Sequence, residues 1–161
     1  SVEQLIEVLL KWLKDAGFSA VRAMPEGMFP QLSGAVVAVS VAKAKAEDAG
    51  FFSYLGLMER DGTLRALYGK ALETEVSLKV ISPQTLGAAA CMQQADALLT
   101  KLSQPIAGVT LLEILAGECK YEMETDVFSC TLTAKAKTYL YAVSNEEETE
   151  FTEFILKGEV Q

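Results

Sequence analysis

Residues 68–102 constrain the fold more than any other part of the chain, because they join a long alternating strand to an amphipathic helix. From Tyr68 to Ile81 apolar and polar residues alternate, which predicts a strand with one buried face and one face in water. At about 3.3 Å per residue this strand would reach about 45 Å, so we expect it to bend or to project beyond the body. Its apolar face consists of Leu72, Thr74, Val76, Leu78 and Val80.

The helix is predicted over residues 84–103, after Ser82-Pro83, and it ends before Pro105 and Gly108. Small residues at 87–90 permit a close approach to a sheet or to another helix. Its apolar stripe consists of Ala88, Cys91, Met92, Ala95, Leu98, Leu99 and Leu102.

The first 46 residues predict a helix, a loop and a strand. Apolar residues recur at intervals of three and four over 2–16, and Gly17 suits a left-handed helix end. Residues 18–33 have no period and contain two prolines, which predicts a loop. Alternation over 35–46 predicts a strand, with small residues on one face. Its other face consists of Val37, Val39, Val41, Lys43 and Lys45.

A β-hairpin is predicted around Asp61-Gly62. This dipeptide favours the type I′ turn that joins two antiparallel strands. The two arms of the hairpin are expected in Phe51–Arg60 and Thr63–Leu67.

Two further strands are predicted at 109–123 and 128–142, with a turn near Thr125-Asp126. On the first of them, Leu112, Ile114 and Ala116 are expected to share one face. Lysines on the second strand could pair with acids on the first across an antiparallel ladder. The groups expected to pair are Glu118, Glu122 and Glu124 with Lys135 and Lys137.

The chain closes with a strand that begins at Phe151, after a polar turn at 145–148. This strand either pairs at the edge of the chain's own sheet or adds a strand to a neighbouring molecule. The order of elements predicts one α+β domain over residues 1–161, in which 146–161 are a candidate extending strand. We expect a mainly antiparallel sheet with two helices packed on one face, together with the hairpin and the C-terminal strand.

The charge and the hydropathy of the chain argue against two classes of protein. The net charge of −8, from 14 basic and 22 acidic residues, argues against a nucleic-acid binder, because such proteins use a basic face to contact phosphates. The sequence contains no run of roughly 18 apolar residues, so no membrane span is predicted. Residues 1–17 mix acids and lysines with apolar residues and do not resemble a secretory signal, so a cytoplasmic location is expected.

Catalytic and metal sites find little support in the sequence. The chain contains no histidine, which excludes Ser-His and Cys-His catalysis. Cys91, Cys119 and Cys130 fit no zinc spacing and are expected to be buried free thiols. Two acid pairs could serve catalysis or hold a cation, but both lie on the water-facing side of a strand, where little would shift their pKa values. These pairs are Glu73 with Glu75 and Glu122 with Glu124. We therefore expect no enzyme, cofactor or metal site.

Several segments carry a resemblance to a known family. They are Leu67-Tyr68-Gly69, Val80–Pro83 followed by Gly87 and Cys91, Leu112–Glu118, Phe128-Ser129-Cys130, Tyr139–Ala142 and Phe151–Gly158. In pattern and order, over about residues 50–158, these segments resemble the tail terminator (tail completion) proteins of tailed bacteriophages and of phage-derived tail-like particles of Firmicutes.

This resemblance implies a function in assembly. The family implies a small α+β protomer that forms a hexameric ring on the tail tube, stops tube growth and joins the head or neck. Partners would be further copies of the chain, the tube protein and a head or neck protein, and DNA would pass through the ring. The location implied is the bacterial cytoplasm during assembly and then the virion or tail-like particle. Candidate contact residues are Asp61, Gly62, Tyr68, Phe151 and Phe154.

Two other functions stay open. Another neck, connector or baseplate component would bind portal or capsid proteins instead of the tube. A small-ligand-binding α+β domain would use a pocket between the helix at 84–103 and the sheet. The small side chains of Ala134, Ala136 and Ala142 would either leave room for such a pocket or let the helix pack closely.

Overall fold

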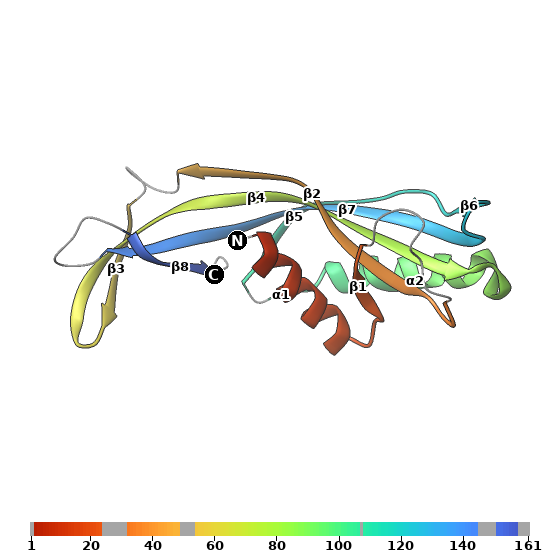
Figure 1. Ribbon diagram of the computed structural model, residues 1–161, viewed down its shortest axis with the longest axis horizontal. Helices are drawn as coiled ribbons and strands as arrows, with labels where there is room; N and C mark the ends of the chain where they lie inside the picture. Colours follow the sequence, from red (N-terminus) through yellow and green to blue (C-terminus); the bar gives the residue numbers. More distant parts are fainter. Residues whose placement is uncertain (1, 24–31, 49–53, 107, 145–150, 158–161) are drawn as a thin grey trace.

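The computed structural model describes residues 2–23, 32–48, 54–106, 108–144 and 151–157 (Figure 1). Within these ranges the chain forms two α-helices, a short 3-10 helix and eight strands. The helices are α1 (Val2–Asp15), η1 (Gln84–Leu86) and α2 (Gly87–Leu102). The strands are β1 (Ala20–Arg22), β2 (Val36–Asp48), β3 (Tyr54–Arg60), β4 (Thr63–Pro83), β5 (Thr110–Ala116), β6 (Lys120–Glu122), β7 (Val127–Ser144) and β8 (Phe151–Lys157).

All eight described strands belong to one sheet, which is built on the central pair β4 and β7. The main order is β1-β2-β4-β7-β5, while β3 pairs with β4, and β6 and β8 pair with β7. The pairing of β1 with β2 is parallel, and the other pairings of the described strands are antiparallel. The mainly antiparallel sheet of the prediction is confirmed.

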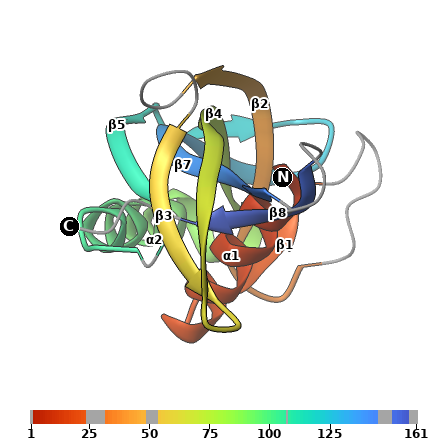
Figure 2. The ribbon, with the colours of Figure 1, turned by 90° about the vertical axis from the view of Figure 1, so that its left-hand side faces the viewer.

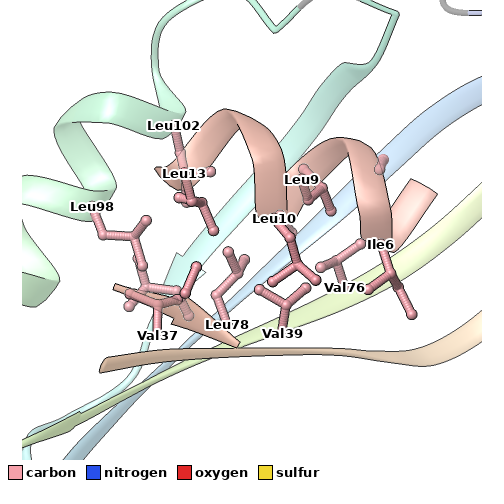
Figure 3. Close-up of a cluster of buried hydrophobic side chains, with 14 of the residues drawn as sticks. Ile6, Leu9, Leu10, Leu13, Val37, Val39, Val76, Leu78, Leu98 and Leu102 are labelled. Atoms are coloured by element: carbon pink, nitrogen blue, oxygen red, sulfur yellow. The ribbon is translucent and has the colours of Figure 1, made fainter. Parts of the chain in front are cut away.

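Both helices pack on the same face of the sheet, which confirms the predicted α+β architecture. Leu9 and Leu13 of α1 and Leu98 of α2 are at most 1% exposed and belong to one apolar cluster with the sheet. Figure 3 shows the side chains of α1 and α2 directed toward the same valines and leucines of β2 and β4. The sheet residues labelled in this close-up are Val37, Val39, Val76 and Leu78.

The end of α1 follows from its sequence. Gly17 has a φ of 95°, which costs little only for glycine. The backbone N–H groups of Gly17 and Phe18 donate to the carbonyls of Lys14 and Leu13, as in a Schellman motif. The helix is thereby turned back toward the sheet, where β1 begins at Ala20.

The long strand is longer than the sequence predicts. The hairpin arm expected at Thr63–Leu67 and the strand expected from Tyr68 are one strand, β4, of 21 residues. The pairing of β4 with β7 continues without a register shift from Leu67 opposite Val143 to Pro83 opposite Val127. One end of this pair lies above the helices, and the other projects beyond them with β3 and β8 (Figure 1). The expected projection is therefore confirmed.

A β-bulge at Ala42 corrects the faces predicted for β2. Val41 pairs with Val76, whereas Lys43 pairs with Glu75, so one extra residue is inserted between them. An extra residue reverses the alternation. Lys43 therefore lies on the face opposite the buried valines, beside Glu75, instead of sharing their face as expected.

A second bulge, at Leu112, corrects the faces predicted for 109–123. The register shifts between Leu111 and Glu113, so that Leu111 and Ile114 pack against the core. Leu112 is 55% exposed, and the face expected for Leu112, Ile114 and Ala116 is wrong. The predicted single strand is also divided into β5 and β6, because residues 117–119 leave the ladder.

Three smaller expectations are also wrong. The loop expected at 18–33 contains β1, which pairs with Val37–Val39. Met92 of the predicted apolar stripe is 57% exposed, because it lies on the rim of α2. The ion pair expected between Glu122 and a lysine of β7 is replaced by others. Glu122 binds Lys79 at 2.8 Å, and Lys135 binds Glu113 at 3.2 Å, because β6 pairs with Val127–Ser129.

Candidate interaction surface

The five predicted contact residues all lie on the projecting end of the sheet. We call this end the arm and define it as β3, the turn at Asp61-Gly62, residues 63–70 of β4, residues 139–144 of β7, and β8. Asp61 and Gly62 form its tip, and Tyr68 lies on β4. Phe151 and Phe154 lie on β8, which pairs with β7 of the same chain. In the described structure the C-terminal strand therefore pairs at the edge of the chain's own sheet, which is one of the two uses left open by the sequence.

The tip of the arm is the predicted hairpin turn. Asp61 and Gly62 have φ values of 53° and 76°, and Arg60 pairs with Thr63 directly across the turn. Positive φ at both central residues defines the type I′ turn, whose twist matches that of the flanking strands. The turn prediction is confirmed, and both residues are exposed.

The register brings three aromatic positions of the arm, Tyr54, Tyr68 and Phe154, into one row. Tyr54 pairs with Tyr68, Tyr68 with Ala142, and Ala142 with Phe154. Residues directly opposite one another in neighbouring strands lie about 5 Å apart, so the row crosses all four strands of the arm within a short distance. Tyr68 and Phe154 are 86 positions apart in the sequence. In the sheet only β7 lies between their strands.

Two leucines of the arm are exposed, and the sequence reasoning did not identify them. Leu57 is 59% exposed and Leu64 is 66% exposed. Leu57 pairs with Ala66, and Leu64 is eight positions before Leu72, so the alternation of β4 places Leu64 and Ala66 on the side that carries the core residues. Extending the alternation of the long strand back to residue 64 would have revealed this apolar face.

The helix-facing side of the sheet therefore continues into the arm without a helix to cover it. In the body this side is buried by α1 and α2, and Val76 and Leu78 are each 1% exposed. Figure 1 places both helices away from the end of the sheet that carries β3. An apolar face that stays exposed in the described chain is typical of a surface that contacts another protein.

The opposite face of the sheet carries a row of alternating charges. Lys43 of β2 pairs with Glu75, Glu75 with Lys135, and Lys135 with Glu113 of β5. A Lys135–Glu113 ion pair of 3.2 Å is part of this row. Alternating charges on neighbouring strands attract one another, and each such pair stabilises the sheet by roughly 0.2–1 kcal/mol.

The acid pairs considered for catalysis have structural partners or lie in water. Glu122 accepts hydrogen bonds from Lys79, Ser129 and Thr125. The bond from Lys79 is the main cause that lowers the pKa of Glu122 below its ordinary value, so this carboxylate stays charged and braces the turn between β6 and β7. Glu73 and Glu124 are exposed.

The three thiols gather where α2 meets the sheet. Cys91 and Cys130 are buried, Cys119 is half-buried, and all three are free. Burial is the main cause that raises the pKa of Cys91 to about 12 and also raises the pKa of Cys130. A thiol with a raised pKa is a poor nucleophile at neutral pH. The expectation of buried free thiols is confirmed for Cys91 and Cys130.

The space between α2 and the sheet, where the ligand-binding alternative would place its pocket, is filled by side chains. Ala134 and Ala136 are 2% and 1% exposed and pack within the core beneath the helices. A hollow of about 380 Å³ lies instead at the end of α2, lined by residues 102–106 and 109–111. Its lining residues are uncharged, and it opens to the surface.

The described residues contain no group of three or more Cys, Asp or Glu that could hold a metal ion. Neither described helix is both long enough and apolar enough to cross a membrane. The expectations of no metal, no cofactor and no catalysis remain predictions.

The chain has also been compared with known proteins. No model of a protein family matches it, and no curated protein matches it either.

Proposed function

We propose that this chain is a structural subunit of a phage tail or a phage-derived tail-like particle. In this proposal it forms a hexameric ring that caps the tail tube, fixes the tail length and joins the tail to the head or neck. Its partners are copies of itself, the tube protein and a head or neck protein. It assembles in the bacterial cytoplasm and remains in the finished particle.

The observation that carries the proposal is the arm. This four-stranded extension carries Leu57 and Leu64, which are exposed on the side of the sheet that the helices cover in the body. Burial of these side chains against a partner would stabilise the complex by about 25 cal/mol per Å² of apolar area removed from water. An assembling subunit needs a projecting surface of this kind, whereas a small-molecule site needs an enclosed pocket.

The charge of the chain is compatible with a ring around DNA. A net charge of −8 disfavours tight contact with the phosphate backbone, so DNA could pass without being held. No sequence-specific nucleic-acid contact is proposed.

The proposal is tested with the tail tube protein from the same genome. Tube assembly is followed by negative-stain microscopy with and without the purified chain. We expect rings on one end of each tube and shorter tubes when the chain is present. Tubes of unchanged length without end rings would overturn the proposal.

A pair of matched variants tests the part played by the arm. Leu57→Ser with Leu64→Ser should abolish capping and leave the thermal midpoint nearly unchanged, because both leucines are exposed. Met123→Ser is the control, since Met123 is 82% exposed in the turn between β6 and β7, far from the arm (Figure 1). Equal capping by all three proteins would exclude the arm as the contact surface.

The same experiment separates the other candidate functions. Binding to a portal or capsid protein, with none to the tube, would favour a neck or connector component. The hollow beside the end of α2 is the observation that favours a ligand-binding domain. Thermal stabilisation by a metabolite library, with no ring at any protein concentration, would support that alternative.

A further inference from the structure

Two edges of the sheet lie at the same height on opposite sides of the molecule. One is the outer edge of β5, which pairs on its other side with β7. The other is the outer edge of β2 beyond residue 39, where the pairing with β1 has ended. Lys43 on β2 and Glu113 on β5 stand in the same row across β4 and β7, which sets the two edges level (Figure 2).

The direction of the strands allows these two edges to meet. Each pairing in the series β2-β4-β7-β5 is antiparallel, so β5 runs opposite to β2. If a second copy stands beside the first in the same orientation, its β2 faces β5 and runs antiparallel to it. The ladder would then continue from one copy to the next in the more stable of the two pairings.

The charges on the two edges favour this contact over the symmetrical ones. The row reads Lys43, Glu75, Lys135, Glu113, and a neighbouring Lys43 next to Glu113 would continue the alternation. With this row kept level, pairing β2 with β2 would place Lys43 opposite Lys43, and pairing β5 with β5 would place Glu113 opposite Glu113. Like charges directly opposite each other destabilise a sheet.

The composition of β5 is unusual for an edge left in water. Its seven residues, TLLEILA, include one charge, and Leu112 and Leu115 are 55% and 59% exposed. Edge strands that stay unpaired are commonly protected by several charges or by proline. With Lys43 of a neighbour next to Glu113, the antiparallel register would place the small, exposed Ala44 opposite Leu112 and the half-buried Val41 opposite Leu115.

We propose that the β5 edge of one copy pairs antiparallel with the β2 edge of a second copy, so that the sheet continues between subunits. The contact is heterologous: each copy offers one edge of each kind, and repetition generates a ring or a filament. This inference rests on the self-association in the proposed function and names the surfaces that carry it.

Two variants with one introduced cysteine each test the contact when they are mixed. Glu113→Cys and Lys43→Cys are purified separately, combined at high concentration and oxidised with copper phenanthroline in air. We expect a disulfide-linked dimer on a non-reducing gel from the mixture and none from either variant alone. The wild-type chain is the control for Cys91, Cys119 and Cys130. A dimer from Glu113→Cys alone would show β5 against β5, and the absence of dimer in the mixture would also overturn the inference.

Charge exchange gives an independent readout. Glu113→Lys alone should weaken self-association about two- to fivefold, and adding Lys43→Glu to the same chain should restore it. The double variant opposes like charges within each copy, because Lys135 then faces a second lysine on β5 and Glu75 faces a second glutamate on β2. Restored association with a lowered thermal midpoint therefore identifies a contact between copies. Loss of association in both variants would contradict the proposal.

The two proposals can fail separately. Tubes capped by a protein whose cysteine variants do not cross-link would retain the proposed function and reject the edge contact. Cross-linking by a protein that does not bind the tube would retain the edge contact and reject the proposed function.

Discussion

At the scale of single residues, Glu122 shows how a carboxylate that was considered for catalysis can serve the fold. Its side chain is 25% exposed, and its ion pair with Lys79 spans 2.8 Å. Hydrogen bonds from Ser129 and Thr125 also favour the charged form. Because all three partners belong to β4 or to the β6–β7 turn region, the carboxylate ties this end of the central strands together.

The lowered pKa of Glu122 predicts a pH-dependent contribution to stability. The folded pKa lies below the ordinary value near 4.5, so the stabilisation is present above pH 4.5 and is lost as the pH falls through the folded pKa. Glu122→Gln should cost about 1 kcal/mol of unfolding free energy at pH 7 and less at pH 3, as measured by urea unfolding. Glu124→Gln is the control. An equal cost at both pH values would contradict the assignment.

A substitution at Thr138 is expected to raise the unfolding free energy instead of lowering it. Its side chain is fully buried, and its hydroxyl has no hydrogen-bond partner among the described residues. Thr138→Val keeps the shape and removes the unsatisfied hydroxyl, so it should raise the unfolding free energy by about 1 kcal/mol. Ser129→Ala should lower it, because the Ser129 hydroxyl donates to Glu122 at 2.9 Å. A destabilised Thr138→Val would show that this hydroxyl is satisfied in solution.

At the scale of elements, the sequence predicted what local patterns determine. The first helix, the turn at Asp61-Gly62 and the alternation of β7 depend on spacing and on turn chemistry. The helix and the turn are confirmed, and the alternation is confirmed over residues 130–138. The bulges at Ala42 and Leu112 depend on which strands become neighbours. Lys43 pairs with Glu75 and therefore lies on the face opposite the valines. The alternation within β2 alone does not identify this partner on β4.

The candidate surface was predictable to the same extent. Asp61, Gly62 and Tyr68 were named from a turn and from a long strand, which are local features. Leu57 and Leu64 were missed, because their exposure depends on where the helices stop covering the sheet. The length and position of that cover are properties of the assembled fold.

Deletion of Ala42 tests the structural role of the first bulge. Without the extra residue, Lys43 follows Val41 directly, so Val41 stays opposite Val76 and Lys43 stays opposite Glu75. Both side chains keep their faces and no charge is buried, so the deletion should lower the unfolding free energy by less than about 1 kcal/mol. Ala42→Ser keeps the residue and should change it by less than about 0.5 kcal/mol. Urea unfolding compares the two, and a loss of more than about 3 kcal/mol on deletion would contradict the placement of the bulge at Ala42.

At the scale of the whole molecule, β4 and β7 belong to both the body and the arm. The single-domain interpretation predicts that the chain unfolds in one transition, because neither region can lose these strands alone. Trp12, the one tryptophan, lies with Lys101 Nζ at 5.5 Å from its ring centroid and so reports the contact between α1 and α2. Circular dichroism reports the sheet. We expect both signals to share one denaturant midpoint, and an earlier loss of sheet signal would reveal an independently unfolding arm.

The uninterrupted ladder between β4 and β7 also has a mechanical consequence. A pull on the tip at Asp61 acts along these strands, while their hydrogen bonds lie across the direction of the force. Such bonds are loaded in shear and must yield together, in contrast to a hairpin that is unzipped one bond at a time. A subunit built in this way transmits tension from its tip to its core without a hinge between them.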